Sequence, residues 1–240
     1  MKIITTSWDD GSIQDLKLAE ILDKYNLQAT FYIPKKNIER PVIGEYLIKE
    51  LSTKFEIGGH TLNHVFLTTV PLAIQWQEIE GCFNWLNEVV GFAPKSFCAP
   101  KGLYTNDILE IAKKVGFTHL RTTHLLNITG ITQNSILPLM HTTVQMYQHS
   151  KFTYFKHLIK RKKIGTLISW FKLHSENEIV KLTEKKLESI HFNKAGCFHL
   201  WGHSWEIEEY DLWSKLEAVC KVLGNQQDFV YMKNNQIINF

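Results

Sequence analysis

Cysteine is scarce in this sequence, and it is not arranged for disulfides or for zinc. The four cysteines, Cys82, Cys98, Cys197 and Cys220, are scattered along the chain and form no Cys-x-x-Cys pair. Such spacing is typical of reduced, mostly buried thiols rather than of a disulfide framework or a zinc knuckle. The sequence therefore does not indicate a small disulfide-bonded protein.

Long apolar runs and a large excess of charge are also missing. No window approaches the ~18 consecutive apolar residues that a membrane-spanning helix needs. The first residues, MKIITTSW, lack the apolar segment and cleavage site of a secretory signal peptide. The net charge of +3 is too small to indicate nucleic-acid binding, and no nucleic-acid module is found. We expect a cytoplasmic protein that does not bind nucleic acid.

What the sequence does contain is a regular alternation of short apolar runs and helical patterns. The predicted strands are 2–6, 29–33, 55–57, 96–98, 119–121, 197–201 and 229–232, the last pairing with 236–239. The predicted helices are 16–22, 45–51, 72–90, 107–115, 178–190 and 211–223. This alternation predicts an α/β protein with a parallel sheet, either open or closed into a barrel. We expect a single domain, 1–240, with an irregular basic and aromatic insertion at about 122–175.

Polar residues follow the predicted strands, where α/β proteins gather their active sites. The stretch TTSWDDGS places Asp9 and Asp10 after the first strand, although Asp-Gly alone is most often a turn. GGHTLNH places His60 and His64 four residues apart, on one face if the segment is helical. Two histidines and a carboxylate make a common catalytic metal site, but such a pair on an exposed helix is often only solvated surface.

Four segments, TSWDDGS, GGHTLNH, CAPKG and LWGHSWE, together resemble the polysaccharide deacetylase family. The family is also called the NodB-homology family or carbohydrate esterase family 4. The resemblance spans about residues 5–205. It implies a distorted (β/α)7 barrel of the NodB type and the metal-dependent hydrolysis of an N-acetyl or other N-acyl group on an amino sugar.

The resemblance also implies a role for each polar residue in these segments. Asp10, His60 and His64 would hold one divalent metal ion, zinc or in its place cobalt or nickel. Asp9 would be the general base toward the activated water, and His203 would be the general acid that protonates the departing amine. The chemistry requires these groups, because an amide is a poor electrophile and its amine cannot leave without a proton.

The substrate would be held by residues at the ends of two predicted strands, 96–98 and 197–201. We expect Pro100, Lys101 and Gly102 to bind it, with a backbone N–H near Lys101 meeting the oxyanion as the resemblance implies. Trp201 and Trp205 form either a wall on which a sugar stacks or part of the core.

The sequence departs from the family's pattern at two places. The fourth-strand segment of the family normally starts with an arginine that orients the base, and here Cys98 stands in that place. Arg121 is the candidate replacement; the alternative is an exposed or salt-bridged arginine. The family's acid-tryptophan segment after the fifth strand is replaced by RTTHL. These departures resemble a divergent subgroup whose last motif is Trp-Gly-His.

The stretch 151–172 holds seven lysines and arginines, no acid and several aromatic residues. It is either a solvated helix with an apolar inner face or an interfacial segment attracted to anionic lipid. The second interpretation predicts peripheral contact with the inner membrane face and a lipid-linked or phosphate-bearing amino sugar in cell-envelope metabolism.

Two other functions fit parts of the sequence. One is a related amide hydrolase acting on small ureides or cyclic imides. The other is a carbohydrate-binding relic without catalysis, which the missing arginine suggests and which the retained acids and histidines contradict.

Overall fold

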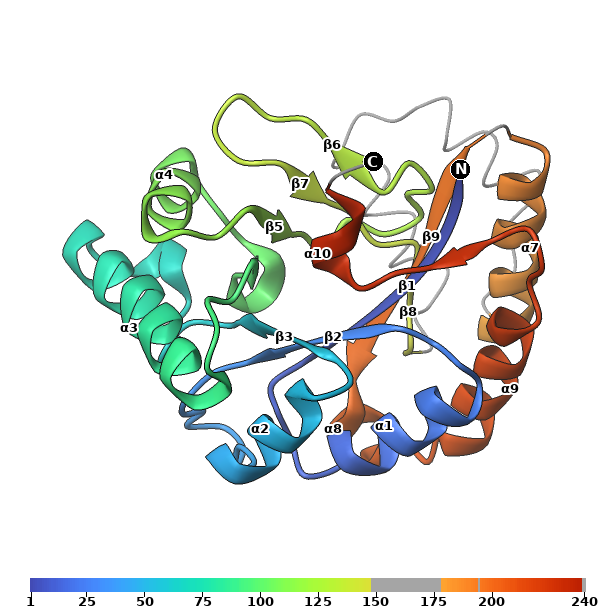
Figure 1. The fold of residues 1–240 in the computed structure, drawn as a ribbon, viewed down its shortest axis with the longest axis horizontal. Helices are drawn as coiled ribbons and strands as arrows, with labels where there is room; N and C mark the ends of the chain where they lie inside the picture. The colour runs from blue at the N-terminus through green and yellow to red at the C-terminus, as the bar shows by residue number, and fades with distance from the viewer. Residues whose placement is uncertain (148–177, 194, 239–240) are drawn as a thin grey trace.

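The computed structural model describes residues 1–147, 178–193 and 195–238, in which strands and helices alternate (Figure 1). The strands are β1 (Lys2–Asp9), β2 (Ala29–Ile33), β3 (Glu56–Gly59), β4 (Ser96–Cys98), β5 (His119–Arg121), β6 (Ile131–Thr132), β7 (Leu139–Met140), β8 (Val144–Gln145), β9 (Gly196–His203) and β10 (Val230–Tyr231). The α-helices are α1 (Asp15–Lys24), α2 (Glu45–Ser52), α3 (Leu72–Val90), α4 (Asn106–Val115), α7 (Ile179–His191), α8 (Ser204–Glu209), α9 (Trp213–Gly224) and α10 (Asn234–Ile237). Two 3-10 helices are η1 (Leu67–Thr69) and η2 (Pro100–Gly102).

The strands close into a ring of parallel wall segments. From β1 the ring runs through β2, β3, β4 and β5, and in the other direction β1 pairs with β9. The segment 139–145 pairs in parallel with β5 at its start, through β7, and with β9 at its end, through β8. This one segment therefore bridges the two ends, and counting it once gives the seven walls of the expected (β/α)7 barrel. Its irregular course is what distorts the barrel.

Helices cover the outside of this ring (Figure 1). Helix α3 packs between α2 and α4, and α7 packs on α9. The helices end where the sequence has glycine: α3 stops at Gly91 with φ 83° and α4 at Gly116 with φ 123°. A residue with a Cβ rarely takes up such angles, so glycine at these positions terminates the helix and turns the chain into the next strand.

The barrel interior is polar along one face of β1. Alternate residues of a strand point to the same side, and on this side Thr5 donates to Asn234 Oδ1 at 2.8 Å while Ser7 Oγ lies 2.8 Å from His199 Nε2. Burial lowers the pKa of His199 to about 3, so this histidine is a neutral hydrogen-bonding residue of the interior. Asp9 is next on the same face and reaches the carboxyl end of the ring.

Helix α10 closes the opposite end of the barrel. The Asn234 backbone N–H donates to Thr30 Oγ1 at 3.1 Å, and its side-chain amide donates to Tyr32 Oη at 2.9 Å. The Asn235 N–H donates to the buried carboxylate of Glu56 at 3.0 Å. These bonds satisfy polar groups at the start of β2 and β3, which leaves the carboxyl end of the strands as the open end.

One local expectation is wrong. The segment 236–239 was expected to be a strand, but its residues up to Ile237 belong to α10, and β10 pairs in parallel with β1 instead. The segment after Gly59, whose helical form was left open, is a loop. A separate short helix, α8, precedes α9 and was not predicted.

The region 122–175 is described only as far as residue 147. This part contains β6, β7 and β8 joined by irregular chain, and the single-domain assignment with an insertion stays a prediction. The basic stretch 151–172 lies outside the described residues. In the described part of the chain, no helix is long and apolar enough to cross a membrane.

Candidate active site

Asp10 is aimed by a sharp turn at the end of β1. Asp10 and Gly11 both lie in the left-handed region, with φ 81° and 63°. Aspartate tolerates this region better than most residues, and glycine has no Cβ to obstruct it. A Cβ on Gly11 would meet Ile33 Cγ2 at 2.7 Å. The Asp-Gly pair is therefore a turn, as its composition indicates, and the turn directs a carboxylate into the barrel mouth.

His60 and His64 converge through a loop after β3. Thr61 and His64 have φ 63° and 56°, which reverses the chain within one turn. The buried carboxylate of Glu78 on α3 holds this loop, accepting from the Asn63 backbone N–H at 2.8 Å and from its side-chain amide at 2.7 Å. The two imidazole centroids lie 5.1 Å apart, an arrangement that comes from the loop and its anchor.

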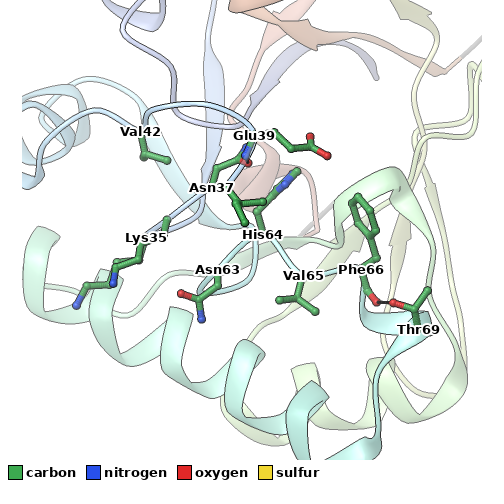
Figure 2. Close-up of a pocket in the computed structure, with 11 residues that line it drawn as sticks. Lys35, Asn37, Glu39, Val42, Asn63, His64, Val65, Phe66 and Thr69 are labelled. Carbon is green, nitrogen blue, oxygen red and sulfur yellow. Dashed lines mark hydrogen bonds between the residues drawn. The ribbon is translucent and has the colours of Figure 1, made fainter.

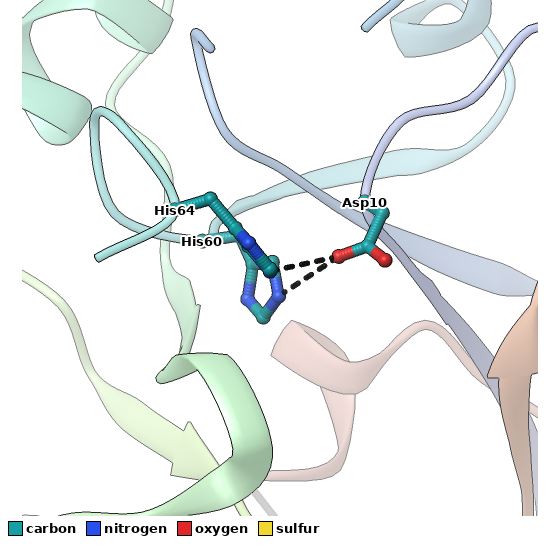
Figure 3. A group of neighbouring side chains, drawn as sticks. All are labelled: Asp10, His60 and His64. Atoms are coloured by element: carbon teal, nitrogen blue, oxygen red, sulfur yellow. Dashed lines mark ion pairs between the residues drawn. The ribbon is translucent and has the colours of Figure 1, made fainter. Parts of the chain in front are cut away.

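Asp10, His60 and His64 form a cluster suited to a metal ion (Figure 3). Asp10 Oδ1 lies 3.4 Å from His60 Nε2 and 3.1 Å from His64 Nε2. His60 Nδ1 donates to the carbonyl of Cys98 at 2.8 Å, so in the neutral ring the Nε2 lone pair faces Asp10. Asp10 Oδ1 is buried without a hydrogen-bond donor. A cation would satisfy all of these atoms, and nitrogen and carboxylate ligands are those that zinc accepts.

The pKa shifts of Asp10 and His60 also favour a cation at this group of side chains. Burial by itself raises the pKa of the Asp10 carboxyl, but the nearby imidazoles of His60 and His64 outweigh burial and hold it well below its usual range. Burial lowers the pKa of His60, and the Asp10 carboxylate outweighs this and raises it well above the ordinary value. The site therefore keeps a negative charge at Asp10 and attracts positive charge beside it.

Asp9 is held by Arg121, which reaches it across the barrel. One guanidinium nitrogen of Arg121 contacts both carboxylate oxygens of Asp9, and the arginine is completely buried. Burial lowers the pKa of Arg121, and the charge of Asp9 outweighs burial and raises it. Arg121 on β5 is the register partner of Cys98 on β4. An arginine from the neighbouring strand thus contacts the expected base at the level where the sequence has cysteine.

His203 ends β9 opposite the two acids. Its Nε2 lies 4.0 Å from Asp9 Oδ2 and 4.0 Å from Asp10 Oδ2, while its Nδ1 lies 2.7 Å from Glu206 Oε2. Burial lowers the pKa of His203, and the hydrogen bond to Glu206 together with the nearby acids raises it above its ordinary value. The ring therefore favours the protonated form, with Nε2 on the side of Asp9 and Asp10.

These side chains share one cavity of about 290 Å³. Its lining residues are Asp9, Asp10, Glu39, His60, His64, Phe66, Lys101, Gly102, Thr123, Leu125, Gln145, Trp201, His203 and Trp205. Of the residues singled out from the sequence, Pro100 is buried at the start of η2 and Arg121 lies behind Asp9. Neither is among the lining residues.

The expected substrate-binding residues differ in what they contact. Trp205 Nε1 donates to Asp10 Oδ2 at 2.8 Å, and the Arg40 guanidinium lies 3.6 Å from its ring centre. Trp205 thus orients the carboxylate of Asp10 by a hydrogen bond, a contact that the sequence did not reveal. Trp201 is buried, with the Arg121 guanidinium 4.9 Å from its ring centre. The Lys101 ammonium lies 3.6 Å from the ring centre of Phe66.

A second, larger cavity of about 800 Å³ adjoins the first (Figure 2). It shares Glu39, His64 and Phe66 with the catalytic cavity and extends past Asn37 in the loop after β2 and Asn63 in the loop after β3. Sequence reasoning missed Asn37 and Asn63 as cavity residues because their meeting depends on how the two loops fold. Glu206 was also missed, because the short helix α8 that brings it beside His203 was not predicted.

Comparisons with known proteins bear on the family and the fold. The family model described as polysaccharide deacetylase matches residues 1–120. No curated protein sequence matches the chain.

Solved structures of low sequence identity share the fold. A protein of Mycobacterium smegmatis described as a polysaccharide deacetylase is 14% identical over 99% of this chain and 88% of its own, with a TM-score of 0.70. A family 4 carbohydrate esterase of Streptomyces lividans is 14% identical over 93% and 86%, with a TM-score of 0.55. The deacetylase PplD of Streptococcus pyogenes is 23% identical, with a TM-score of 0.50. The match covers 57% of this chain and 62% of that protein.

The structures support the barrel architecture, and the family model covers half of the sequence, including the turn at Asp9 and Asp10 and the histidine loop. The chain belongs to the polysaccharide deacetylase family.

Proposed function

We propose that the protein is a metal-dependent hydrolase that removes an N-acetyl or other N-acyl group from an amino sugar. The observation that carries this proposal is the convergence of the Asp10, His60 and His64 cluster with Asp9 and His203 on one cavity. A metal site, a carboxylate and a protonated histidine are the groups that hydrolysis of an amide requires.

Asp10, His60 and His64 would hold the divalent ion, and zinc fits their donor atoms best. Bound there, the ion would lower the pKa of water and polarise the acyl carbonyl. Trp205 keeps Asp10 in place from the other side through its 2.8 Å hydrogen bond.

Asp9 would take the proton from the attacking water. Its contact with Arg121 keeps the carboxylate in one orientation, since the arginine is buried and its guanidinium lies 5.1 Å and 4.9 Å from the ring centres of Tyr32 and Trp201. This supports Arg121 as the residue that positions the base in place of an arginine at Cys98.

His203 would give a proton to the nitrogen of the departing amine. The raised pKa of its imidazole favours the charged form that can donate, and Nε2 is the atom nearest the two acids of the site. Lys101 and Gly102 line the same cavity, where a backbone N–H of this turn would meet the oxyanion.

The test is acetate release from oligomers of N-acetylglucosamine by protein loaded with zinc. Wild type should release acetate, and Asp9→Asn should lower kcat by about 100-fold or more because the base is lost. His60→Ala should lose activity together with the metal. If wild type cleaved small ureides or cyclic imides and no N-acetylated sugar, the alternative hydrolase would be correct. If it cleaved neither, the protein would be a binding relic.

The carrier of the sugar is a finer proposal that rests on sequence alone. We propose a lipid-linked or phosphate-bearing substrate in cell-envelope metabolism, reached by a cytoplasmic protein that contacts the inner membrane face through 151–172. Replacing the four basic residues 160–163 with glutamine should abolish co-sedimentation with vesicles containing anionic lipid. Equal sedimentation of the variant and wild type would contradict this part.

A further inference from the structure

Glu206 and His203 form a closely matched pair at the end of β9. His203 is the residue before the first turn of α8, and Glu206 lies within that turn. Residues three apart in a helical turn lie on one face, and His203 Nδ1 is 2.7 Å from Glu206 Oε2. A carboxylate can only accept, so Nδ1 carries the proton in this pair.

Glu206 is itself held from the neighbouring strand. Gln145 on β8 donates its side-chain amide to Glu206 Oε2 at 3.4 Å, and Gln145 lines the catalytic cavity. The Glu206 side chain is only 14% exposed. A carboxylate held by two neighbours and shielded from water keeps one orientation, and it therefore fixes the orientation of the ring that it bonds.

We propose that Glu206 is a positioning residue for catalysis, which accepts the Nδ1–H of His203 and so keeps the Nε2 edge of the ring directed at the reacting centre. The inference rests on the proposed function, because it assigns a partner to the general acid of that reaction. Glu206 is not one of the candidate metal ligands Asp10, His60 and His64, and the rate should still depend on it.

The proton balance of the step explains why such a partner is needed. When the C–N bond of the amide breaks, its electron pair stays on nitrogen, and Nε2–H gives that nitrogen a proton. The ring then becomes neutral and keeps its Nδ1–H bonded to Glu206. Because Glu206 accepts the Nδ1 proton before and after the transfer, the proton that leaves is the one on Nε2.

The sharpest test compares two substrates that differ in their need for an acid. An N-acetylglucosamine oligomer has an amine that must be protonated to leave, whereas 4-nitrophenyl acetate releases an anion that leaves without a proton. Glu206→Gln should lower kcat on the amide by about 10- to 100-fold, with KM unchanged. Its rate on the ester should stay within about two-fold of wild type, because base and metal are intact.

Matched variants separate positioning from folding. Glu208→Gln changes an exposed acid on the same helix and should leave both rates unchanged. His203→Ala should show the same split between amide and ester, and adding Glu206→Gln to it should cost nothing more. Glu206→Asp should restore part of the amide rate. An equal loss on both substrates, or no loss on either, would overturn the role of Glu206 while the proposed function stands.

A readout without substrate covers the case in which wild type cleaves neither compound. Nitrogen-15 NMR of the His203 ring reports which nitrogen carries the proton. In wild type the neutral ring should be protonated at Nδ1, and Glu206→Ala should shift this proton toward Nε2. The same tautomer in both proteins would contradict the inference independently of any activity.

Discussion

Arg121 is a buried cation that contacts the carboxylate of Asp9. The sequence left open whether this arginine serves the base or is an exposed or salt-bridged arginine, because nothing local distinguishes these cases. The structure places it in the barrel interior, in contact with Asp9 and at the level of Cys98. The contact depends on how β4 and β5 sit in register, which a single sequence does not specify.

Replacement of Arg121 should cost both stability and rate. Arg121→Met leaves the buried Asp9 carboxylate without its partner, so we expect a loss of about 3–5 kcal/mol in unfolding free energy. Urea unfolding measures this loss, and kcat on the amide should fall with it. Introducing Cys98→Arg into this variant should restore part of both. If Arg121→Met unfolded like wild type, the pairing would not contribute as described.

Trp205 offers a prediction about metal affinity rather than rate. Trp205→Phe removes the N–H that donates to Asp10 Oδ2 at 2.8 Å and keeps an aromatic ring against Arg40. Loss of such a partner to a metal ligand should weaken metal binding by about 10-fold or more. Competition with a chelator measures the affinity, and Trp213→Phe on α9 is the matched control. Equal affinity in Trp205→Phe and wild type would contradict the assignment.

At the scale of elements, the short turn η2 brings left-handed backbone to the edge of the cavity. Gly102 has φ 65°, and a Cβ there would clash with Thr123. Gly102→Ala should therefore lower the unfolding free energy by about 1–3 kcal/mol, combining backbone strain with the clash. Gly91→Ala is the control, since Gly91 has φ 83° with open space around it. Equal losses in the two variants would show that Thr123 accommodates the methyl group.

The elements that could be predicted are those with a simple period. Strands such as β2 and the long helix α3 follow directly from apolar spacing. The histidine loop could not be derived in this way, because its shape depends on left-handed Thr61 and His64 and on the distant anchor Glu78. The two histidines were still identified, since residue type and position after a strand carry that signal.

At the scale of the whole molecule, the closure of the sheet into a barrel could not be predicted from the sequence. The segment 139–145 lies in a region without clear periodicity, and its two short pairings become visible only when β5 and β9 are both in place. The α/β class itself was accessible because alternation of strands and helices is a property of the whole chain.

The stability of the protein should depend on pH because Asp15, below the site, is a buried acid. Burial raises the pKa of Asp15 to about 8, so the folded protein keeps this proton while the unfolded chain loses it near pH 4. The unfolded state then binds fewer protons than the native state, and stability falls as pH rises from about 4 to 8. Asp15→Asn should flatten this slope of about 1.4 kcal/mol per pH unit, gaining on the order of 3–4 kcal/mol at pH 8 relative to pH 5. An identical slope in both proteins would contradict a buried, protonated Asp15.

The central claim is that the barrel mouth is a metal centre built by Asp10, His60 and His64. Metal analysis of purified protein, as isolated and after incubation with zinc and dialysis, tests it most directly. Wild type should hold about one divalent ion per chain, and His60→Ala should hold almost none, while His191→Ala, at a surface histidine, should match wild type. The absence of metal in wild type even after incubation with zinc, or equal metal content in wild type and His60→Ala, would contradict the account.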